Sequence, residues 1–412
     1  MRVLMFLTPA SSHVVATAPL AWALQTAGHS VLVASQPEAV EMIQAAGLVA
    51  TPLKAGLDLM ETTAQPASIT EQMMSSLDLN DAEEVVRITV REFVLPSLAG
   101  YTSLEAAPLV EACLELIDGW RPDVIVWDGG YYPAGIAAHM TKKPQVRLLW
   151  GRDWEGMLRH RLRELGAGTT DVLAEHFAPL LEHLGIEFDE RMLLGEASID
   201  PNPVEMRWPT GLDYLSVRWT PYTGPGVVPD WATAPAPNGR ICVSLGLSYR
   251  ELADDSDVPI VEILRGLAEL GPEVVATLDA RQVAPGTTFP DNVRLVDHMP
   301  LSALLSTCSA VVNHGGTGTW SAALSHGVPQ VIITRPHMDY PRFGEHTEAA
   351  GAGVHIPLIE DRQTMADAVV RAVALVLSDP AYVESARALF ARTNRAPSPA
   401  ELVAKIEDMV RV

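Results

Sequence analysis

Short apolar runs alternate with helix-like segments along most of the 412-residue chain. In the first part of the chain these runs cover residues 3–7, 31–34, 123–128 and 145–150. In the second part they cover residues 240–245, 273–278, 292–296, 310–312 and 331–333. Runs of this length are typical of buried strands, and helices between such strands cover both faces of a parallel sheet. The pattern therefore predicts an α/β protein that contains two parallel sheets.

The amino-acid composition changes near residue 216, where prolines and glycines become frequent and remain so up to residue 239. A stretch of this composition is typical of a linker between domains. We predict an N-terminal domain at 1–215, a linker at 216–239 and a C-terminal domain at 240–390. Residues 391–412 are expected to form a helix that packs back on the N-terminal domain. Two such domains leave a cleft at the carboxyl ends of their strands, where ligands bind in this architecture.

The C-terminal domain contains a glycine-rich turn, in which residues 313–318 read Asn-His-Gly-Gly-Thr-Gly. An apolar run precedes this turn, and a helix-like segment and a second apolar run follow it. Glycines let the backbone approach a ligand closely, and the start of the helix directs N–H groups and a positive dipole end at the same place. This combination predicts an anion site, most commonly for phosphate. The alternative is a tight turn without a ligand.

A histidine and an aspartate follow two different predicted strands of the N-terminal domain. His13 lies just past the run 3–7, and Asp128 ends the run 123–128. A histidine that is oriented by a carboxylate is a competent general base near neutral pH. The alternative is that both residues only cap, or pack against, the helices that follow their strands.

Three further polar residues follow predicted strands of the C-terminal domain. Ser244 and Ser248 begin and end the turn 244–248 at the carboxyl end of the run 240–245, and Asp339 follows the run 331–333. The serines can add hydroxyl and N–H donors to the anion site, or they can form an ordinary strand-to-helix turn. Asp339 can accept hydrogen bonds from the hydroxyl groups of a sugar, or it can be a turn residue.

Composition and charge exclude several classes of partner. The net charge of -22 argues against nucleic acid and against an anionic membrane surface, because both require a basic field on the protein. The three cysteines are widely spaced, which gives neither a disulfide framework nor a zinc pattern and fits a reducing cytoplasm. No apolar stretch is long enough to span a membrane. Pro9 interrupts the N-terminal apolar run, so we expect a first strand there and not a signal peptide.

Residues 57–100 are less regular and carry Met60, Met73, Met74 and Phe93. Methionines in such a segment are typically core filler. The alternative is a roomy apolar site for a small-molecule acceptor.

With these motifs the chain resembles, over nearly its full length, the inverting nucleotide-sugar-dependent glycosyltransferases of the GT-B fold. The matching motifs are residues 12–13, 19–24 and 27–29 in the first half, and 314–319 (His-Gly-Gly-Thr-Gly-Thr) and 327–330 (Gly-Val-Pro-Gln) in the second. Residues 148–151, 221–231 and 243–251 are similar to actinobacterial transferases that glycosylate polyketides. That subgroup typically uses dTDP-activated deoxysugars and macrolide or aromatic aglycones. The resemblance implies two Rossmann-like parallel-sheet domains that face each other across a cleft.

The resemblance also implies a role for each candidate residue. His13 matches the general base of the family, and Asp128 matches the acid that orients it. The residues that match the diphosphate loop are His314, Gly315, Gly316, Thr317 and Gly318, to which we add Ser244 and Ser248 as possible donors. The residues that match the nucleoside-binding segment are Val296, His298 and Met299. Asp339 and Tyr340 stand where an Asp-Gln pair often contacts the donor sugar, and the change from Gln to Tyr favours a less hydroxylated deoxysugar.

The implied function is inverting transfer of a deoxysugar from a dTDP-sugar to a hydroxyl group, or to carbon or nitrogen, of a polyketide-type aglycone in antibiotic biosynthesis. We expect no metal ion and no cofactor, because N–H groups of the glycine turn and the helix dipole can meet the charge of the departing diphosphate. The expected partners are the nucleotide-sugar donor and an apolar acceptor, while a helper protein and a homodimer stay open. The alternatives are a sugar-nucleotide epimerase or hydrolase on the same scaffold and a non-catalytic nucleotide-sugar-binding protein.

Overall fold

The computed structural model describes residues 1–56, 81–88, 101–166, 171–245, 258–278, 283–284, 286–297, 299–335 and 339–411. The chain divides into two compact units. Unit 1 consists of Met1–Arg218 together with Pro397–Val412, and unit 2 consists of Trp219–Ala396. Most of the proline-rich stretch 216–239 therefore belongs to unit 2, and the last helix of the chain belongs to unit 1.

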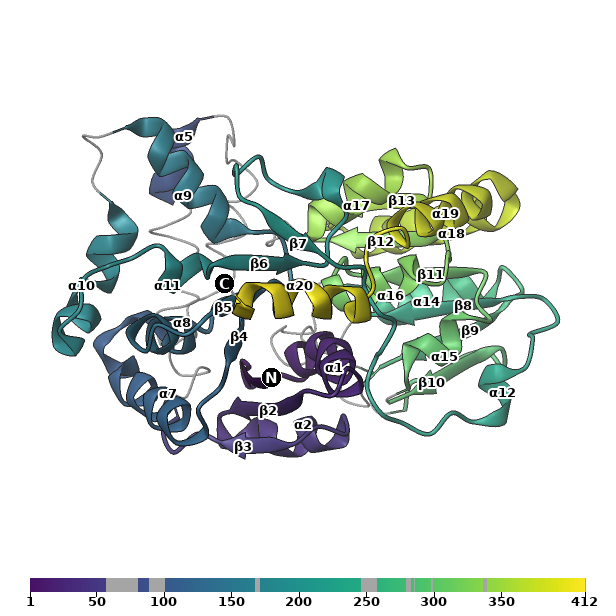
Figure 1. The fold of residues 1–412 in the computed structure, drawn as a ribbon. Helices are drawn as coiled ribbons and strands as arrows, with labels where there is room; N and C mark the ends of the chain where they lie inside the picture. Colours follow the sequence, from purple (N-terminus) through teal and green to yellow (C-terminus); the bar gives the residue numbers. More distant parts are fainter. Residues whose placement is uncertain are drawn as a thin grey trace. The chain divides into compact units, whose positions relative to one another are not determined.

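Unit 1 contains a seven-stranded sheet in the order β3-β2-β1-β4-β5-β6-β7, in which every neighbouring pair is parallel (Figure 1). The strands are β1 (Arg2–Phe6), β2 (Ser30–Ser35), β3 (Ala50–Pro52), β4 (Val124–Asp128), β5 (Gln145–Leu148), β6 (Ala197–Asp200) and β7 (Tyr214–Ser216). The direction of the strand order reverses between β1 and β4, so their carboxyl ends meet at the switch point of the sheet. Four of these strands match predicted apolar runs. The short strands β3, β6 and β7 do not, because each offers too few positions for a pattern.

In the described part of unit 1, all helices lie between these strands along the chain except the C-terminal one, which returns after unit 2. They are α1 (Ser11–Thr26), α2 (Val40–Ala45), α5 (Ala82–Ile88), α7 (Ala107–Trp120), α8 (Tyr132–Met140), α9 (Trp154–Leu165), α10 (Val172–Leu184), α11 (Arg191–Leu194) and α20 (Pro399–Arg411), with short 3-10 turns at Pro37–Ala39, Leu104–Ala106 and Val204–Met206. Helix α1 begins at Ser11, so His13 lies in its first turn and Pro19 in its interior.

The C-terminal helix α20 packs against α1 and β7 of unit 1 (Figure 1). Leu402, Val403 and Ile406 of α20 are buried. A carboxylate oxygen of Glu407 lies 2.9 Å from Nε2 of His29, whose side chain is only 9% exposed. An apolar face and the contact between Glu407 and His29 therefore hold the end of the chain against the N-terminal unit.

Unit 2 contains a six-stranded parallel sheet in the order β10-β9-β8-β11-β12-β13. The strands are β8 (Arg240–Ser244), β9 (Glu273–Thr277), β10 (Val293–Val296), β11 (Ala310–Asn313), β12 (Gln330–Thr334) and β13 (Gly353–Pro357). The first five match the predicted runs, and β13 is an additional edge strand. The prediction of two parallel-sheet α/β domains is confirmed.

Helices cover both faces of the sheet in unit 2. They are α12 (Asp230–Thr233), α14 (Ile260–Ala268), α15 (Leu301–Leu305), α16 (Thr317–Leu324), α17 (Tyr340–Ala349), α18 (Arg362–Ser378) and α19 (Pro380–Thr393). Alternate residues of β8 enter different cores: Ile241 and Val243 pack with α14 and α18, and Cys242 packs with α15 and α16. Burial on both faces explains why these strands are continuously apolar in sequence.

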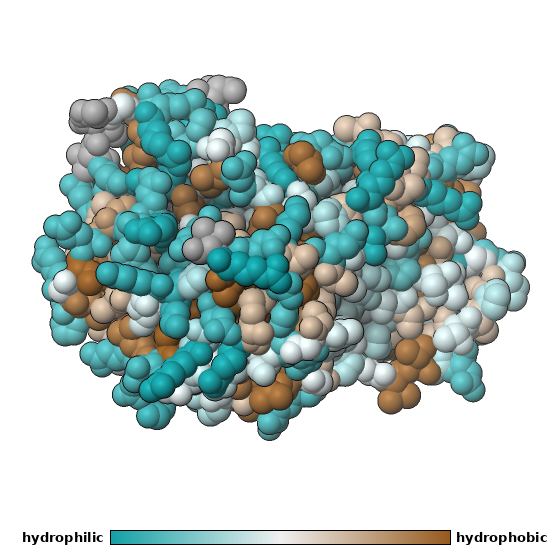
Figure 2. Space-filling model, in the orientation of Figure 1, coloured by the Kyte–Doolittle hydropathy of each residue, from teal (hydrophilic) through white to brown (hydrophobic). Residues whose placement is uncertain are grey.

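Apolar side chains are mainly interior in both units. Figure 2 shows a surface on which hydrophilic side chains predominate and hydrophobic ones occur in small separate groups. Within the described part of the chain, no helix has the length and the apolar character that crossing a membrane requires.

Candidate active site

His13 and Asp128, which the sequence places on separate segments, are in direct contact in unit 1. His13 lies in the first turn of α1, and Asp128 is the last residue of β4. Nδ1 of His13 lies 2.5 Å from Oδ2 of Asp128, which also accepts a hydrogen bond from the backbone N–H of Thr8 at 3.1 Å. The two side chains are 16% and 3% exposed, respectively. The pair is therefore a largely enclosed His–Asp dyad at the switch point of the sheet.

The environment of the dyad determines its protonation chemistry. Burial lowers the pKa of His13, but the negative charge of Asp128 and the hydrogen bond to it raise the pKa by more, so that the net shift from 6.5 is upward. An ionised carboxylate can only accept hydrogen bonds, so the neutral imidazole donates from Nδ1 and keeps its lone pair on Nε2. Nε2 is therefore the atom that can take a proton from a substrate.

Trp150 contacts the dyad, although the sequence indicated no role for it. Its ring and that of His13 have centroids 5.2 Å apart at a tilt of 56°. Its indole N–H donates a hydrogen bond of 2.9 Å to the carbonyl of Gly129, the residue after Asp128. One feature of the sequence could have indicated this contact. Trp150 follows shortly after β5, and β5 ends at the same edge of the sheet as β1 and β4.

A buried polar network supports the loop that carries Trp150. Arg147 of β5 is fully buried, and it donates to Oδ2 of Asp153 at 2.5 Å and to Oγ of Ser198 at 2.9 Å. Asp153 in turn accepts from the backbone N–H of Gly156 and caps the start of α9. Both ends of the short segment between β5 and α9 are thereby fixed, which restricts the position of Trp150.

The glycine turn of unit 2 is held by a pair of side-chain amides. Asn313, the last residue of β11, accepts a hydrogen bond from the N–H of Gly315 at 2.8 Å and donates to Oε1 of Gln330 at 2.9 Å. Asn313 and Gln330 are both buried. Gly315 has a φ of +80°, a conformation that favours glycine. The turn is therefore a fixed structure, as a backbone binding site requires.

His314 and Gly316 bring an imidazole to the start of a helix. Gly316 is the N-cap of α16, and it has no side chain that could cap the helix. A Cβ atom on Gly316 would overlap with Nε2 of His314, which is 7% exposed. The N–H groups of the first helical turn and the imidazole therefore lie together, and this combination suits an anion.

The other predicted site residues of unit 2 have different surroundings. Ser244 is buried at the end of β8, next to Asn313 in the register of β8 and β11, and its Oγ accepts from Oγ1 of Thr277 at 2.9 Å. Val296 ends β10, and Met299 is 4% exposed and packs in the core with α15. Asp339, also 4% exposed, is the N-cap of α17 without capping it through its side chain.

Several predictions cannot be located in the structure. Ser248 and His298 lie outside the described residues, as do Met60, Met73, Met74 and Phe93. Among the residues that the structure describes, no group of three or more His, Cys, Asp and Glu side chains could hold a metal ion.

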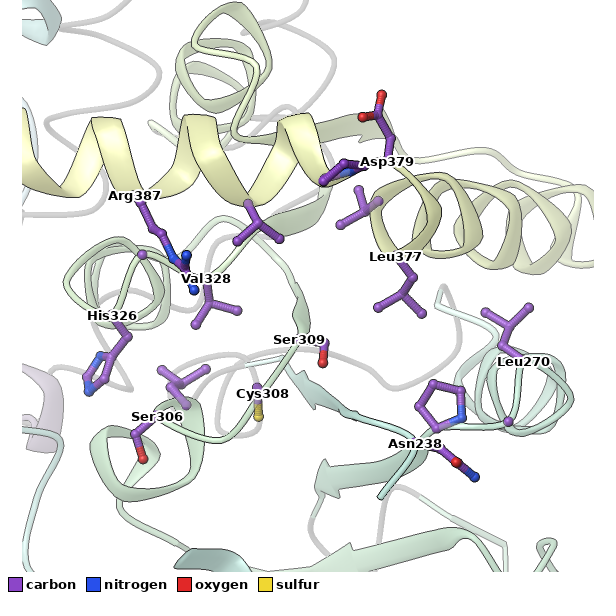
Figure 3. Close-up of a pocket in the computed structure, with 17 residues that line it drawn as sticks. Asn238, Leu270, Ser306, Cys308, Ser309, His326, Val328, Leu377, Asp379 and Arg387 are labelled. Atoms are coloured by element: carbon purple, nitrogen blue, oxygen red, sulfur yellow. The ribbon is translucent and has the colours of Figure 1, made fainter. Parts of the chain in front are cut away.

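A cavity of about 720 Å³ in unit 2 does not coincide with the glycine turn (Figure 3). Its lining includes Asn238, Pro272, Ser309 and Val328, which lie one or two residues before strands β8, β9, β11 and β12. It therefore opens at the amino ends of the strands, whereas the glycine turn follows the carboxyl end of β11. The cavity is not the anion site.

Two family models match most of the chain. Residues 22–246 match the family model described as erythromycin biosynthesis protein CIII-like, N-terminal domain, and residues 261–409 match the corresponding C-terminal domain. The aclacinomycin-T 2-deoxy-L-fucose transferase of Streptomyces galilaeus is 36% identical over 431 residues, which cover 99% of this chain and 96% of the relative. The 3-alpha-mycarosylerythronolide B desosaminyl transferase of Saccharopolyspora erythraea is 34% identical and covers 99% of this chain and 98% of the relative.

Solved structures show the same architecture over the whole chain. Spinosyn forosaminyltransferase SpnP has a TM-score of 0.81 at 32% identity, with both chains covered completely. The glycosyltransferase VinC, solved in complex with dTDP, has a TM-score of 0.82 at 31% identity, again with complete coverage. The chain thus belongs to the erythromycin biosynthesis protein CIII-like family and is a nucleotide-sugar-dependent glycosyltransferase of the GT-B fold.

Proposed function

We propose that the enzyme transfers a deoxysugar from a dTDP-sugar to a hydroxyl group of a polyketide-type aglycone, with inversion at the anomeric carbon. The observation that carries this proposal is the contact of 2.5 Å between His13 and Asp128 at the carboxyl edge of the unit 1 sheet. Relatives named as transferases of 2-deoxy-L-fucose and desosamine support the sugar class, and the dTDP bound in VinC supports the nucleotide.

Proton removal accompanies the attack in the proposed reaction. Nε2 of His13 removes the proton of the acceptor hydroxyl as its oxygen attacks the anomeric carbon. Asp128 holds the imidazole in the productive tautomer and stabilises the imidazolium that forms. A base on the attacking side and a leaving group on the opposite face of the sugar give inversion.

The leaving diphosphate is assigned to unit 2. N–H groups at Gly315–Gly318, the dipole of α16 and the imidazole of His314 are donors fixed before the reaction, so they meet the developing charge without reorganising. We assign Val296, His298 and Met299 to the nucleoside and Ser244 and Ser248 to the edge of the diphosphate site. Asp339 is assigned to the sugar hydroxyls, beside Tyr340, which offers a ring where a glutamine would offer hydrogen bonds.

The test is a transfer assay with a panel of dTDP-deoxysugars and of macrolide and anthracycline aglycones, read by mass spectrometry and by NMR of the anomeric configuration. The expected result is an inverted glycoside. His13→Ala is expected to lower turnover by about 10²–10⁴-fold, the usual contribution of a general base, while the Kd for dTDP is retained. His183→Ala, an exposed histidine of α10, is the matched control.

Other products would identify a different function. Consumption of the dTDP-sugar without any acceptor adduct would indicate a hydrolase or epimerase, and binding without turnover would indicate a non-catalytic partner. Adding cell extract of a strain that makes the glycosylated polyketide would show whether a helper protein is needed. Light scattering would show whether the enzyme is a homodimer.

A further inference from the structure

Tyr340 contacts the diphosphate loop at two consecutive residues. Its ring and the imidazole of His314 have centroids 5.2 Å apart and are nearly perpendicular, at 86°. Its backbone carbonyl faces Gly315, where an added Cβ atom would lie 3.1 Å from the carbonyl oxygen. The first residue of α17 thus lies directly against the turn that follows β11.

The imidazole of His314 is confined from two sides. On one side lies Gly316, which has no room for a Cβ atom beneath Nε2 of His314. On another side lies the ring of Tyr340 in an edge-to-face arrangement, which is attractive because the positive edge of one ring meets the negative face of the other. A Cβ atom on Gly316 would occupy the place of the imidazole, and loss of the Tyr340 ring would remove the aromatic contact on its other side.

We propose that Tyr340 is a positioning residue for the leaving group: it acts through His314, whose imidazole it holds over the first turn of α16 as a donor to the diphosphate. This inference rests on the proposed function, and it gives Tyr340 a task other than direct recognition of the donor sugar. A glutamine at this position could bind sugar hydroxyls, but it could not supply an aromatic edge or face to the imidazole. The tyrosine therefore has two effects. It offers fewer hydrogen bonds to a sugar, which suits a deoxysugar, and it helps the turn to hold the diphosphate.

A double-mutant cycle on ligand binding tests this role. The Kd for dTDP is measured by calorimetry for the wild type, His314→Ala, Tyr340→Ala and the double variant. His314→Ala is expected to weaken dTDP about 10- to 100-fold, since it removes a hydrogen bond to a charged group. Tyr340→Ala is expected to weaken dTDP about 5-fold or more, because it keeps the donor but removes the ring that packs against it. In the His314→Ala background, Tyr340→Ala is expected to add no further loss.

Two further measurements separate positioning from general destabilisation. Tyr340→Phe is expected to restore affinity to within about 2-fold of the wild type, because it keeps the aromatic ring that packs against the imidazole. Binding of thymidine, which lacks phosphates, should be equal in all variants. Tyr382→Ala, the same substitution on α19, should show no coupling with His314→Ala.

The outcomes distinguish this inference from the function on which it rests. If the losses from Tyr340→Ala and His314→Ala are additive, or if thymidine binding falls in parallel with dTDP binding, Tyr340 does not act through His314. If the wild type does not bind dTDP at all, the proposed function fails as well.

Discussion

One side chain of unit 1, Trp150, contacts both His13 and the backbone of the residue that follows Asp128. Its ring lies 5.2 Å from that of His13, and its N–H bonds to the carbonyl of Gly129 directly after Asp128. The loop after β5 thereby braces the residues that follow β1 and β4. The position of His13 thus depends on three strand ends and not only on its contact with Asp128.

Substitution of Trp150 is therefore expected to reduce turnover without changing the affinity for the nucleotide. Trp150→Ala removes the ring against His13 and the hydrogen bond to Gly129, and we expect kcat to fall about 10- to 100-fold, because small displacements of a catalytic group are costly. Trp150→Phe keeps a ring and is expected to lose less. Steady-state kinetics and the Kd for dTDP check this. An unchanged kcat in Trp150→Ala would show that Trp150 does not position His13 for the reaction.

The upward shift of the pKa of His13 predicts a specific pH dependence. A general base acts when deprotonated, so kcat/KM should rise with pH through the pKa of His13, and the midpoint should lie above the ordinary value of 6.5. Asp128→Asn removes the charge and weakens the hydrogen bond that raise this pKa, while the burial that lowers it remains. The midpoint should therefore move to lower pH.

The same variant should be slower at every pH, because the imidazolium loses its stabilising carboxylate. We expect a plateau about 10²-fold lower or more, by analogy with other His–Asp pairs. The pH profile of kcat/KM for the wild type and Asp128→Asn gives both quantities. A midpoint that stays in place, or moves upward, would contradict the assignment of Asp128.

The features that sequence predicted are those that depend on local patterns and on simple rules of sheet geometry. The turn at Gly315 and Gly316 is a local motif between a strand and a helix. The approach of His13 to Asp128 follows from the rule that carboxyl ends of neighbouring parallel strands share an edge. Neither prediction required knowledge of side-chain packing.

The features that sequence missed are contacts between side chains far apart in the chain. The contact of Trp150 with His13 and that of Tyr340 with His314 depend on ring orientations that packing selects. The bond between Asn313 and Gln330 joins two strand positions whose partners are fixed only by the register of β11 and β12. A single sequence carries no pattern that specifies such pairs.

Gly316→Ala is expected to weaken dTDP binding through a steric effect on His314. The φ of Gly316 is -64°, so alanine fits the backbone, but its Cβ would overlap with Nε2 of His314. We expect an increase in the Kd for dTDP of about 10-fold or more, since the imidazole must leave its place. A Cβ on Gly318 would meet no atom within 4 Å, so Gly318→Ala should lose far less affinity. Equal losses for the two variants would rule out the clash as the cause.

Shortening a buried side chain of the C-terminal helix α20 should destabilise unit 1. Ile406 of α20 is fully buried, and Ile406→Ala removes apolar contacts and leaves a cavity. The expected loss in the free energy of unfolding is about 2–5 kcal/mol, measured by chemical denaturation. Lys405→Ala, an exposed neighbour on the same helix, should change it by less than about 0.5 kcal/mol. A small loss for Ile406→Ala would mean that α20 contributes little to the stability of unit 1.

The side-chain amide of Gln330 should control the rigidity of the glycine turn at residues 313–318. Gln330→Ala leaves Nδ2 of the buried Asn313 without its acceptor, and Asn313 is the residue that bonds the N–H of Gly315. Loss of one buried partner costs about 1–3 kcal/mol, so unit 2 should unfold at lower denaturant concentration. Because the loop is no longer held, the Kd for dTDP should increase as well. Gln363→Ala, on the exposed face of α18, is the matched control and should change neither quantity. If Gln330→Ala lowers stability but leaves dTDP binding intact, the amide pair supports the fold of unit 2 and not the site.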